Sequence, residues 1–349
     1  MNRNIFYILT LIILIGCSTE HEENPIMEDL YVSFSNGISY NQTITESRTG
    51  IFGGTFIPKD EIVGIYGFKS VKEGNNVEIN DQWQIKDIQT NCNNEPYRSQ
   101  GASERLTSEN RTEIKFPTGK NPALVFYGYY PYLLEEDIIL ESSDKGPKIK
   151  LNIYPNMEQT SEYLYTGNVP VIPTNSTTEV ALPFKHALTC LSFHISTNDN
   201  NYYEGNCPIV KEIIVKTHVS QSGYMYIKNG NITTTNEGNF TFSYQTDFSV
   251  DVNKQNDDID TGANFLFIPT DEPKGNAIDE IILKVQEPNS TNVKNYTVYK
   301  YDVFDDNAIS LKRGAKYIVN IEYNVRMTIT SHNVNTWVGG NSYDLEIND

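Results

Sequence analysis

Three residues near the middle of the sequence are of types that bind metal ions. His186, Cys190 and His194 follow one another at intervals of four, so an extended strand would place them on one face. Residues four apart along a strand lie about 13 Å from one another, whereas zinc needs its ligands at about 2.0–2.3 Å. One strand therefore cannot supply this metal site, and we expect a polar outer strand face instead.

The acidic residues offer two further candidates for chemistry. Asp257, Asp258 and Asp260 form the densest acidic cluster, but a calcium loop counted from either of the first two lacks the Gly and Glu combination of an EF-hand. An irregular calcium site and a solvated loop both remain open as interpretations. Glu135 and Glu136 could act as glycosidase carboxylates only at a set spatial separation, which a sequence does not give.

The sequence contains none of the common local motifs of catalysis or nucleotide binding. There is no G-x-S-x-G, no H-E-x-x-H, no phosphate-binding loop and no G-x-G-x-x-G. We therefore expect no catalytic residue, no metal and no cofactor. The 349-residue chain has a formal net charge of -18 and no long Lys/Arg cluster, which argues against nucleic acid as a partner.

The first seventeen residues have the organisation of an export signal. The apolar run from Ile5 to Ile15 is too short to span a bilayer but suits a signal-peptide core. It leads into Leu14–Cys17, which resembles a bacterial lipobox, in which the sulfur of Cys17 takes diacylglycerol. The alternative is an ordinary secretory signal. The acidic stretch Ser18–Glu23 is similar to the signal that sends Bacteroidetes lipoproteins to the outer leaflet, although a flexible tether would look the same.

The other three cysteines, Cys92, Cys190 and Cys207, do not form a recognisable framework. Their number is odd and they lack C-x-x-C spacing, which argues against a zinc knuckle. Cys190 and Cys207 flank a polar loop and could pair in an oxidising compartment.

Alternation of residue character predicts an all-β protein. Leu30, Val32 and Phe34 alternate with Tyr31, Ser33 and Ser35, the period of a half-buried strand. A longer alternation extends from Tyr317 to Ile329 and fits either one long strand or two. Further strands are expected at residues 61–68, 123–131, 187–195, 209–215, 240–244, 265–268, 278–285 and 296–303.

The polar stretches between these strands predict loops and a linker. Residues 72–82 and 89–113 have the composition of long loops, and residues 173–179 are the best linker candidate. The length is typical of about two domains. Two packed β-sandwiches follow from the strand spacing and the turn signals.

Several short segments, taken in order, resemble the fimbrillin family of Bacteroidales, the type V pilins. Each segment is weakly specific, but their order extends over nearly the whole mature chain. Lys59 stands where Gly is more usual in the family, and no Trp precedes that strand. The matching segments are Glu46–Gly50, Lys59–Tyr66, Phe126–Tyr132, Pro183–Phe193, Phe267–Pro269, Leu311–Tyr317 and Asn335–Trp337.

The resemblance implies two transthyretin-like β-sandwich domains in tandem. It implies a signal peptide over residues 1–16 and a lipidated propeptide with the first strand over 17–48. An N-terminal sandwich over 49–178 and a C-terminal sandwich with a possible donor strand over 179–349 would follow.

The resemblance also implies a route of maturation. A trypsin-like protease would cut between Arg48 and Thr49, and the strand with Leu30, Val32 and Phe34 would act as a placeholder. Arg48 is the only Lys or Arg between Arg3 and Lys59. The alternatives are an uncut surface arginine and a permanent strand.

The expected donor is the segment after Ile329 in a neighbouring subunit, which would enter the opened groove by strand addition. Val334, Trp337 and Val338 would be its apolar anchors, whereas the acidic residues 344–349 would be solvated.

On this basis we expect a structural subunit (stalk, tip or anchor) of a surface fimbria, attached to the outer membrane by its lipid. Its partners would be other fimbrial subunits, with surface ligands of host or bacterial cells as a further expectation. The alternatives are a surface glycan-binding lipoprotein, which would need a flat aromatic platform, and a secreted hydrolase, which would need a pocket with converging catalytic groups.

Overall fold

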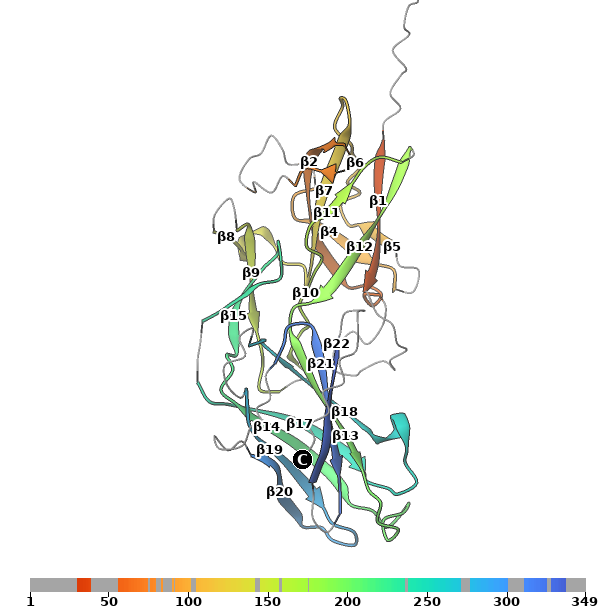
Figure 1. Cartoon of the computed structure of the whole chain (residues 1–349), viewed down its shortest axis with the longest axis vertical. Coiled ribbons are helices and arrows are strands. Elements are labelled where there is room, and N and C mark those ends of the chain that lie inside the picture. Colours follow the sequence, from red (N-terminus) through yellow and green to blue (C-terminus); the bar gives the residue numbers. More distant parts are fainter. Residues whose placement is uncertain are drawn as a thin grey trace, which may run out of the picture.

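The computed structural model shows an elongated all-β molecule with an upper lobe, a lower lobe and a small sheet beside their junction (Figure 1). No helix among the described residues is long and apolar enough to cross a membrane. Besides strands, the described chain contains the short 3₁₀ turns η3 (Glu135–Asp137) and η5 (Asn256–Ile259). The structure describes residues 30–38, 56–74, 76–79, 83, 90, 92–101, 105–141, 145–156, 159–174, 176–235, 238–270, 277–300, 311–324 and 328–336.

The upper lobe is a continuous ring of paired strands. Its order is β7, β10, β12, β1, β5, β4 and β2, and pairing of β2 with β7 closes the ring. Three short strands attach to it: β3 to β2, β6 to β1 and β11 to β7. The strands are β1 (Tyr31–Ile38), β2 (Ile62–Glu73), β3 (Asn76–Val77), β4 (Glu95–Ser99), β5 (Arg105–Ser108), β6 (Ile114–Lys115), β7 (Pro122–Tyr130), β10 (Leu164–Tyr165), β11 (Val169–Val171) and β12 (Thr177–His186).

The central strands of this ring are buried on both faces. Along β7, Leu124 and Phe126 point into the core inside the ring, whereas Val125 and Tyr127 belong to the core outside it. Such strands carry a nearly continuous apolar run instead of an alternation. The outer face of β2 and β7 is covered by Trp83, whose ring lies 4.8 Å from that of Phe68.

The lower lobe consists of two four-stranded sheets that pack face to face as a β-sandwich. One has the order β18, β13, β21, β22 and the other β17, β14, β19, β20. Phe242 of β17 meets Phe267 of β18 edge to face at 5.3 Å across the interior. The strands are β13 (Thr189–Ser196), β14 (Ile209–Thr217), β17 (Phe240–Ser249), β18 (Asp260–Phe267), β19 (Ile278–Gln286), β20 (Val293–Lys300), β21 (Ala315–Glu322) and β22 (Thr328–Thr336).

A third sheet, the waist sheet, joins segments from both halves of the chain. Its order is β16 (Ile232–Thr234), β15 (Ser222–Tyr226), β9 (Pro147–Asn152) and β8 (Ile138–Leu140). Ile149, Leu151 and Met225 are fully buried in it. They belong to one core cluster that extends from the outer face of the ring into the lower sandwich, so the two lobes share a continuous core.

The structure confirms the all-β class and corrects several local expectations. Residues 89–113 are not one loop, because they contain β4 and β5, which complete the ring. The alternation from Tyr317 to Ile329 resolves into the antiparallel pair β21 and β22. Val325 and Met327, within that alternation, lie outside the described residues.

The stretch expected to be a linker ends inside a strand. Residues 177–179 belong to β12, which pairs with β1 and β10 in the upper ring, whereas the next strand, β13, belongs to the lower sandwich. The change of sheet therefore falls between His186 and Thr189. We propose this position as the domain boundary in place of residues 178 and 179.

Candidate functional site: the first strand in its groove

Strand β1 is one of the strands that form the ring, and it is paired along both edges. It runs parallel to β12, from Tyr31 opposite Thr177 to Ile38 opposite Phe184. On its other edge it runs antiparallel to β5 and β6. Two backbone hydrogen bonds extend this pairing at its start, from the Tyr31 N–H to the Ser176 carbonyl at 2.8 Å and from the Phe116 N–H to the Leu30 carbonyl at 3.1 Å.

The inward face of β1 fills the core of the ring. Phe34 is 3% exposed, and its ring meets those of Tyr97 and Phe126 edge to face at 5.1 and 4.8 Å. Val32 and Leu30, two and four residues earlier on the same face, are partly buried against this core. Burial raises the pKa of Tyr97, which keeps its phenol neutral beside Phe34.

Asn36 continues the inward face with a buried polar group. It is 1% exposed, and its Oδ1 accepts a hydrogen bond from the Ile57 N–H at 2.9 Å. Its Nδ2 donates to Ser99 Oγ at 3.3 Å. We call the Ile57 N–H and the Ser99 hydroxyl the Asn36 site. Alternation alone places Asn36 on the inward face, but Asn is more typical of surface and turn positions. The sequence therefore did not indicate that Asn36 is buried.

The outward face of β1 is bordered by basic residues in an otherwise acidic protein. Tyr31 lies opposite Lys115 of β6, and the Lys115 Nζ lies 5.1 Å from the centre of the Tyr31 ring. Ser35 lies opposite Arg105 of β5. On the β12 side, Ser33 lies opposite Glu179.

This arrangement defines what loss of β1 would do. The ring would open between β12 and β5, leaving two sheet edges with unpaired backbone groups. The apolar cavity left by Phe34 and the Asn36 site would face solvent together. Such a groove is a template for another extended segment.

The strand at the other end of the described chain is held differently. Strand β22 is the edge of its sheet and pairs only with β21, from Thr328 opposite Glu322 to Thr336 opposite Ala315. Val334, expected as a donor anchor, lies opposite Tyr317 in this pairing.

Five of the predicted processing and anchor positions cannot be placed. Cys17, Arg48, Thr49, Trp337 and Val338 lie outside the described residues.

The candidate metal ligands do not share one strand. His186 ends β12 and Cys190 and His194 lie in β13. The expected polar outer face is wrong for His186 and Cys190, because both are buried. His186 Nδ1 is bonded to the Glu162 carboxylate, and His194 Nε2 lies 3.9 Å from Asp260 Oδ2. No group of three metal-binding side chains occurs within the described part of the chain.

The remaining cysteines are all thiols. Cys92 and Cys190 are buried and Cys207 is half-buried, and all three are free, so the alternative of a Cys190–Cys207 disulfide is wrong. Burial raises the pKa of Cys190 to about 12, which makes its thiol unreactive.

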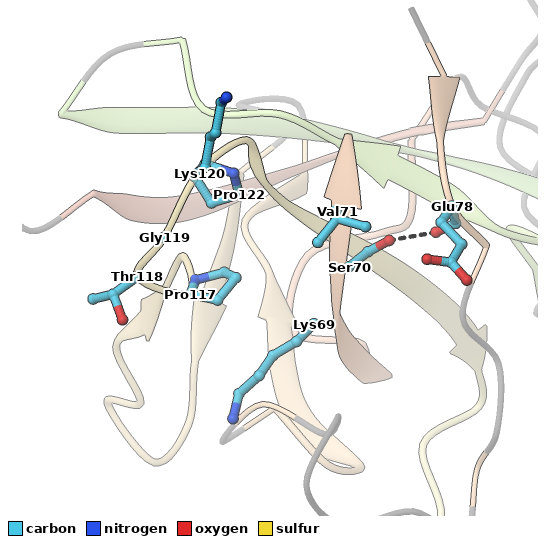
Figure 2. Close-up of a pocket in the computed structure, with 9 residues that line it drawn as sticks. All are labelled: Lys69, Ser70, Val71, Glu78, Pro117, Thr118, Gly119, Lys120 and Pro122. Carbon is cyan, nitrogen blue, oxygen red and sulfur yellow. Dashed lines mark hydrogen bonds between the residues drawn. The ribbon is translucent and has the colours of Figure 1, made fainter. Parts of the chain in front are cut away.

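A pocket of about 270 Å³ is lined by residues of β2 and by the segment that leads into β7 (Figure 2). Lys69, Lys120 and Glu78 are its charged lining residues. The Ser70 hydroxyl donates to the Glu78 backbone carbonyl, so it is not paired with a general base.

A second pocket, of about 460 Å³, lies on the sheet of β14, β17 and β19. Its charges are largely paired with one another. Lys216 Nζ lies 2.5 Å from Glu280 Oε2, and Asp279 holds His218 at 3.1 Å. The Thr217 hydroxyl, which lines this pocket, donates its hydrogen bond to the Ala277 carbonyl. It is therefore not hydrogen-bonded to His218 as a nucleophile activated by the His218–Asp279 pair would be.

Aromatic residues gather at the far end of the lower lobe. Tyr202 and Tyr296 both pack against Tyr323 edge to face, at 5.7 and 6.2 Å. The hydroxyls of Tyr296 and Tyr323 donate to the Glu287 carboxylate. These rings pack on one another and do not form the flat platform that glycan binding would favour.

Comparisons with known proteins agree on a family and on the fold. A family model described as fimbrillin-like matches residues 49–337. No curated protein matches the chain by sequence. Three solved structures share the fold: a candidate cell adhesion protein of Bacteroides uniformis (TM-score 0.53, 13% identity, 90% of this chain and 99% of that chain covered), one of Bacteroides ovatus (0.53, 14%, 90% and 99%) and a fimbrial protein of Bacteroides vulgatus (0.51, 13%, 88% and 99%).

Proposed function

The chain belongs to the fimbrillin-like family, and on this premise we propose that it is a structural subunit of a surface fimbria. Family membership and the fold shared with a fimbrial protein of Bacteroides vulgatus support this assignment. Its partners are then other fimbrial subunits, and its site of action is the cell surface.

Assembly follows from exchange of β1. Cleavage between Arg48 and Thr49 frees β1 from the rest of the chain, and a strand of another subunit takes its place. The observation that carries this proposal is the position of β1, which is paired on both edges and fills the ring with Phe34. Until it leaves, β1 covers an apolar groove that would otherwise associate prematurely.

The sequence around β1 fits this role. Arg48 lies between β1 and Ile57, the first described residue of the upper core after it, and it is the only Lys or Arg between Arg3 and Lys59. The family model begins at Thr49, so β1 lies outside the matched region. A cut at Arg48 would separate the two.

Export as a lipoprotein would bring the subunit to the outer membrane. Acylation of Cys17 with several chains anchors a protein firmly, whereas one chain binds only marginally. Cys17→Ala should release the protein or leave its signal uncleaved. Labelling with radioactive palmitate checks this, and unchanged labelling of the variant would contradict it.

The test of exchange is cleavage of the purified, unlipidated chain by trypsin. Arg48→Ala should stay uncut at this position and monomeric, whereas Arg48→Lys, which trypsin also cleaves, should form the same ladder on a gel as wild type. Mass spectrometry identifies the cut. If uncut Arg48→Ala assembles as well as wild type, strand exchange is the wrong mechanism.

A further inference from the structure

One sheet of the lower lobe carries the same five-residue pattern twice. Glu212–Lys216 of β14 has the sequence E-I-I-V-K, and Glu280–Lys284 of β19 has the sequence E-I-I-L-K. The two strands are antiparallel neighbours (Figure 1), and Ile214 lies opposite Ile282. The register therefore relates the two patterns by a local two-fold axis that passes between these isoleucines.

Alternate residues of each pattern face away from the core of the sandwich. Ile213 and Val215 of β14 are fully buried, as are Ile281 and Leu283 of β19. The residues between and beside them are half-buried and lie on the outer face of the sheet. We call the six outward residues the two-fold patch: Glu212, Ile214, Lys216, Glu280, Ile282 and Lys284.

Two ion pairs border the isoleucines of the two-fold patch. Lys284 Nζ lies 2.6 Å from Glu212 Oε2, and Lys216 Nζ lies 2.5 Å from Glu280 Oε2. Because the strands are antiparallel, each glutamate lies beside the lysine of the neighbouring strand. The four charges therefore alternate in sign around the two isoleucines. They sum to zero, although the chain has a formal net charge of -18.

The flanking strands border the two-fold patch with uncharged polar residues. These are Ser243 and Gln245 on β17, and Thr297 and Asn295 on β20. A small apolar centre within a polar rim is the usual anatomy of a protein interface. Because the rim is neutral, the alternating charges of the patch decide what can lie on it.

We propose that the two-fold patch binds a second copy of this chain, face to face. A two-fold axis in the plane of the patch, whether along the strands or across them, places every glutamate of one copy over a lysine of the other. With the axis along the strands, for example, Glu212 lies over Lys284 of the second copy. The isoleucines of both copies meet at the centre, with the two sheets about 10 Å apart.

Charge complementarity favours a second copy over other occupants. A strongly acidic chain repels its own copies over most of its surface. The two-fold patch is neutral, and its pattern is its own complement, so the contact adds attraction where the rest of the surface does not. A uniformly acidic or basic partner would place half of these charges beside like charges, which disfavours binding.

The contact between a single pair of subunits is weak. Exposed ion pairs contribute little each, and association costs translational and rotational freedom. We expect a dissociation constant of about 0.1–1 mM, so the uncut chain stays monomeric at the micromolar concentrations that suit the test of strand exchange. In a fimbria, a context that rests on the proposed function, many such contacts in series would join two filaments side by side.

The first test measures self-association of the purified, unlipidated Arg48→Ala chain, in which the proposed exchange of β1 cannot start. Sedimentation velocity from about 10 µM to about 1 mM should show a reversible dimer. Ile214→Asp should weaken the dimer at least about ten-fold, because it puts an unpaired carboxylate at the centre of the contact. Ile139→Asp, at a 43% exposed isoleucine of the waist sheet, is the matched control and should leave the dimer unchanged.

Equal urea midpoints check that these variants fold alike. A chain that stays monomeric throughout this concentration range would overturn the inference. Dimerisation of Ile214→Asp at the level of the Ile139→Asp control would overturn it as well.

Charge inversion tests whether the two-fold patch binds the same patch of a second copy. The inverted variant combines Glu212→Lys, Lys216→Glu, Glu280→Lys and Lys284→Glu in the Arg48→Ala chain. It keeps both internal ion pairs and the alternation of charge, so it should dimerise as well as the Arg48→Ala chain does. A mixture of the two should form mixed dimers at least about five-fold less than like dimers, because every charge then meets its own sign.

Energy transfer between different fluorescent labels on the two chains measures the mixed dimers. Mixed dimers at the statistical proportion would place the contact elsewhere and overturn the inference. Neither test needs cleavage, so failure of this inference leaves strand exchange intact, and failure of strand exchange leaves the dimer of the uncut chain intact.

Discussion

Strand β1 and the waist sheet both close a core, but they depend on the chain in different ways. Strand β1 fills the upper ring from one end of the described chain, and residues 39–55 are its only covalent link to the rest of the lobe. The waist sheet combines β8 and β9 with β15 and β16, which lie far apart in the sequence. No single cut between strands removes it from the core that joins the lobes (Figure 1).

If β1 is exchanged as proposed, the difference separates a replaceable part of the molecule from a permanent one. In the proposed exchange, cleavage near Arg48 would change only which chain supplies one strand of the ring. The waist sheet keeps the lower sandwich attached to the ring in either state, because Ile149, Leu151 and Met225 stay buried between them. A subunit of this design can exchange a strand without separating its lobes.

The largest expected effect comes from truncating the two cores. Phe34→Ala should lower the free energy of unfolding by about 3–5 kcal/mol, and Leu151→Ala by about 2–5 kcal/mol, because each leaves a cavity. Urea denaturation measures both. After cleavage, however, only Phe34→Ala should speed the loss of β1, since Leu151 does not touch its groove. If β1 is released at the same rate from both cleaved variants, the two regions do not differ in the way described. Ser33→Ala, on the exposed face of β1, is the control.

A smaller effect is expected at the Asn36 site. Asn36→Ala leaves the buried Ile57 N–H without its acceptor and should cost about 1–3 kcal/mol. Asn36→Asp keeps an acceptor and should cost less. Urea denaturation of the uncleaved chain measures both, and a loss for Asn36→Ala no larger than for Ser33→Ala would show that the site does not hold β1.

The smallest effect concerns the outer face of the waist sheet. Glu141 accepts hydrogen bonds from Lys148 at 2.7 Å, from the Tyr226 hydroxyl at 2.6 Å and from Lys145 at 3.1 Å. These bonds, led by Lys148, lower the pKa of Glu141 from 4.5 to about 2. Because the folded pKa is depressed, this contribution is complete above the ordinary value and is lost as the pH falls toward about 2.

Glu141→Gln should therefore lose its destabilising effect as the solution is acidified from about pH 5 to about pH 2. Urea midpoints of the variant and wild type should converge over this range. An effect that does not change with pH would mean that the carboxylate charge does not stabilise the waist sheet. The release of β1 should be the same in both proteins.

The sequence by itself determined the local preferences of the chain. Its period of two and its turn residues predict an all-β protein, because successive side chains of a strand point to opposite faces. The same period puts Leu30, Val32 and Phe34 on one face. The order of short motifs was sufficient to indicate the family, which the match over residues 49–337 confirms.

Only the tertiary structure decided which strands pair and where polar residues are satisfied. Alternation predicts that one face of a strand is buried, but it does not identify the neighbouring strand. The parallel pairing of β1 with β12 and the strand composition of the waist sheet therefore could not be predicted from the sequence. Strands β4 and β5 read as loops because they are short and polar, and their partners in the ring hold them extended. Asn36 is buried because Ile57 and Ser99, distant in sequence, supply its hydrogen bonds, and no local pattern encodes such partners.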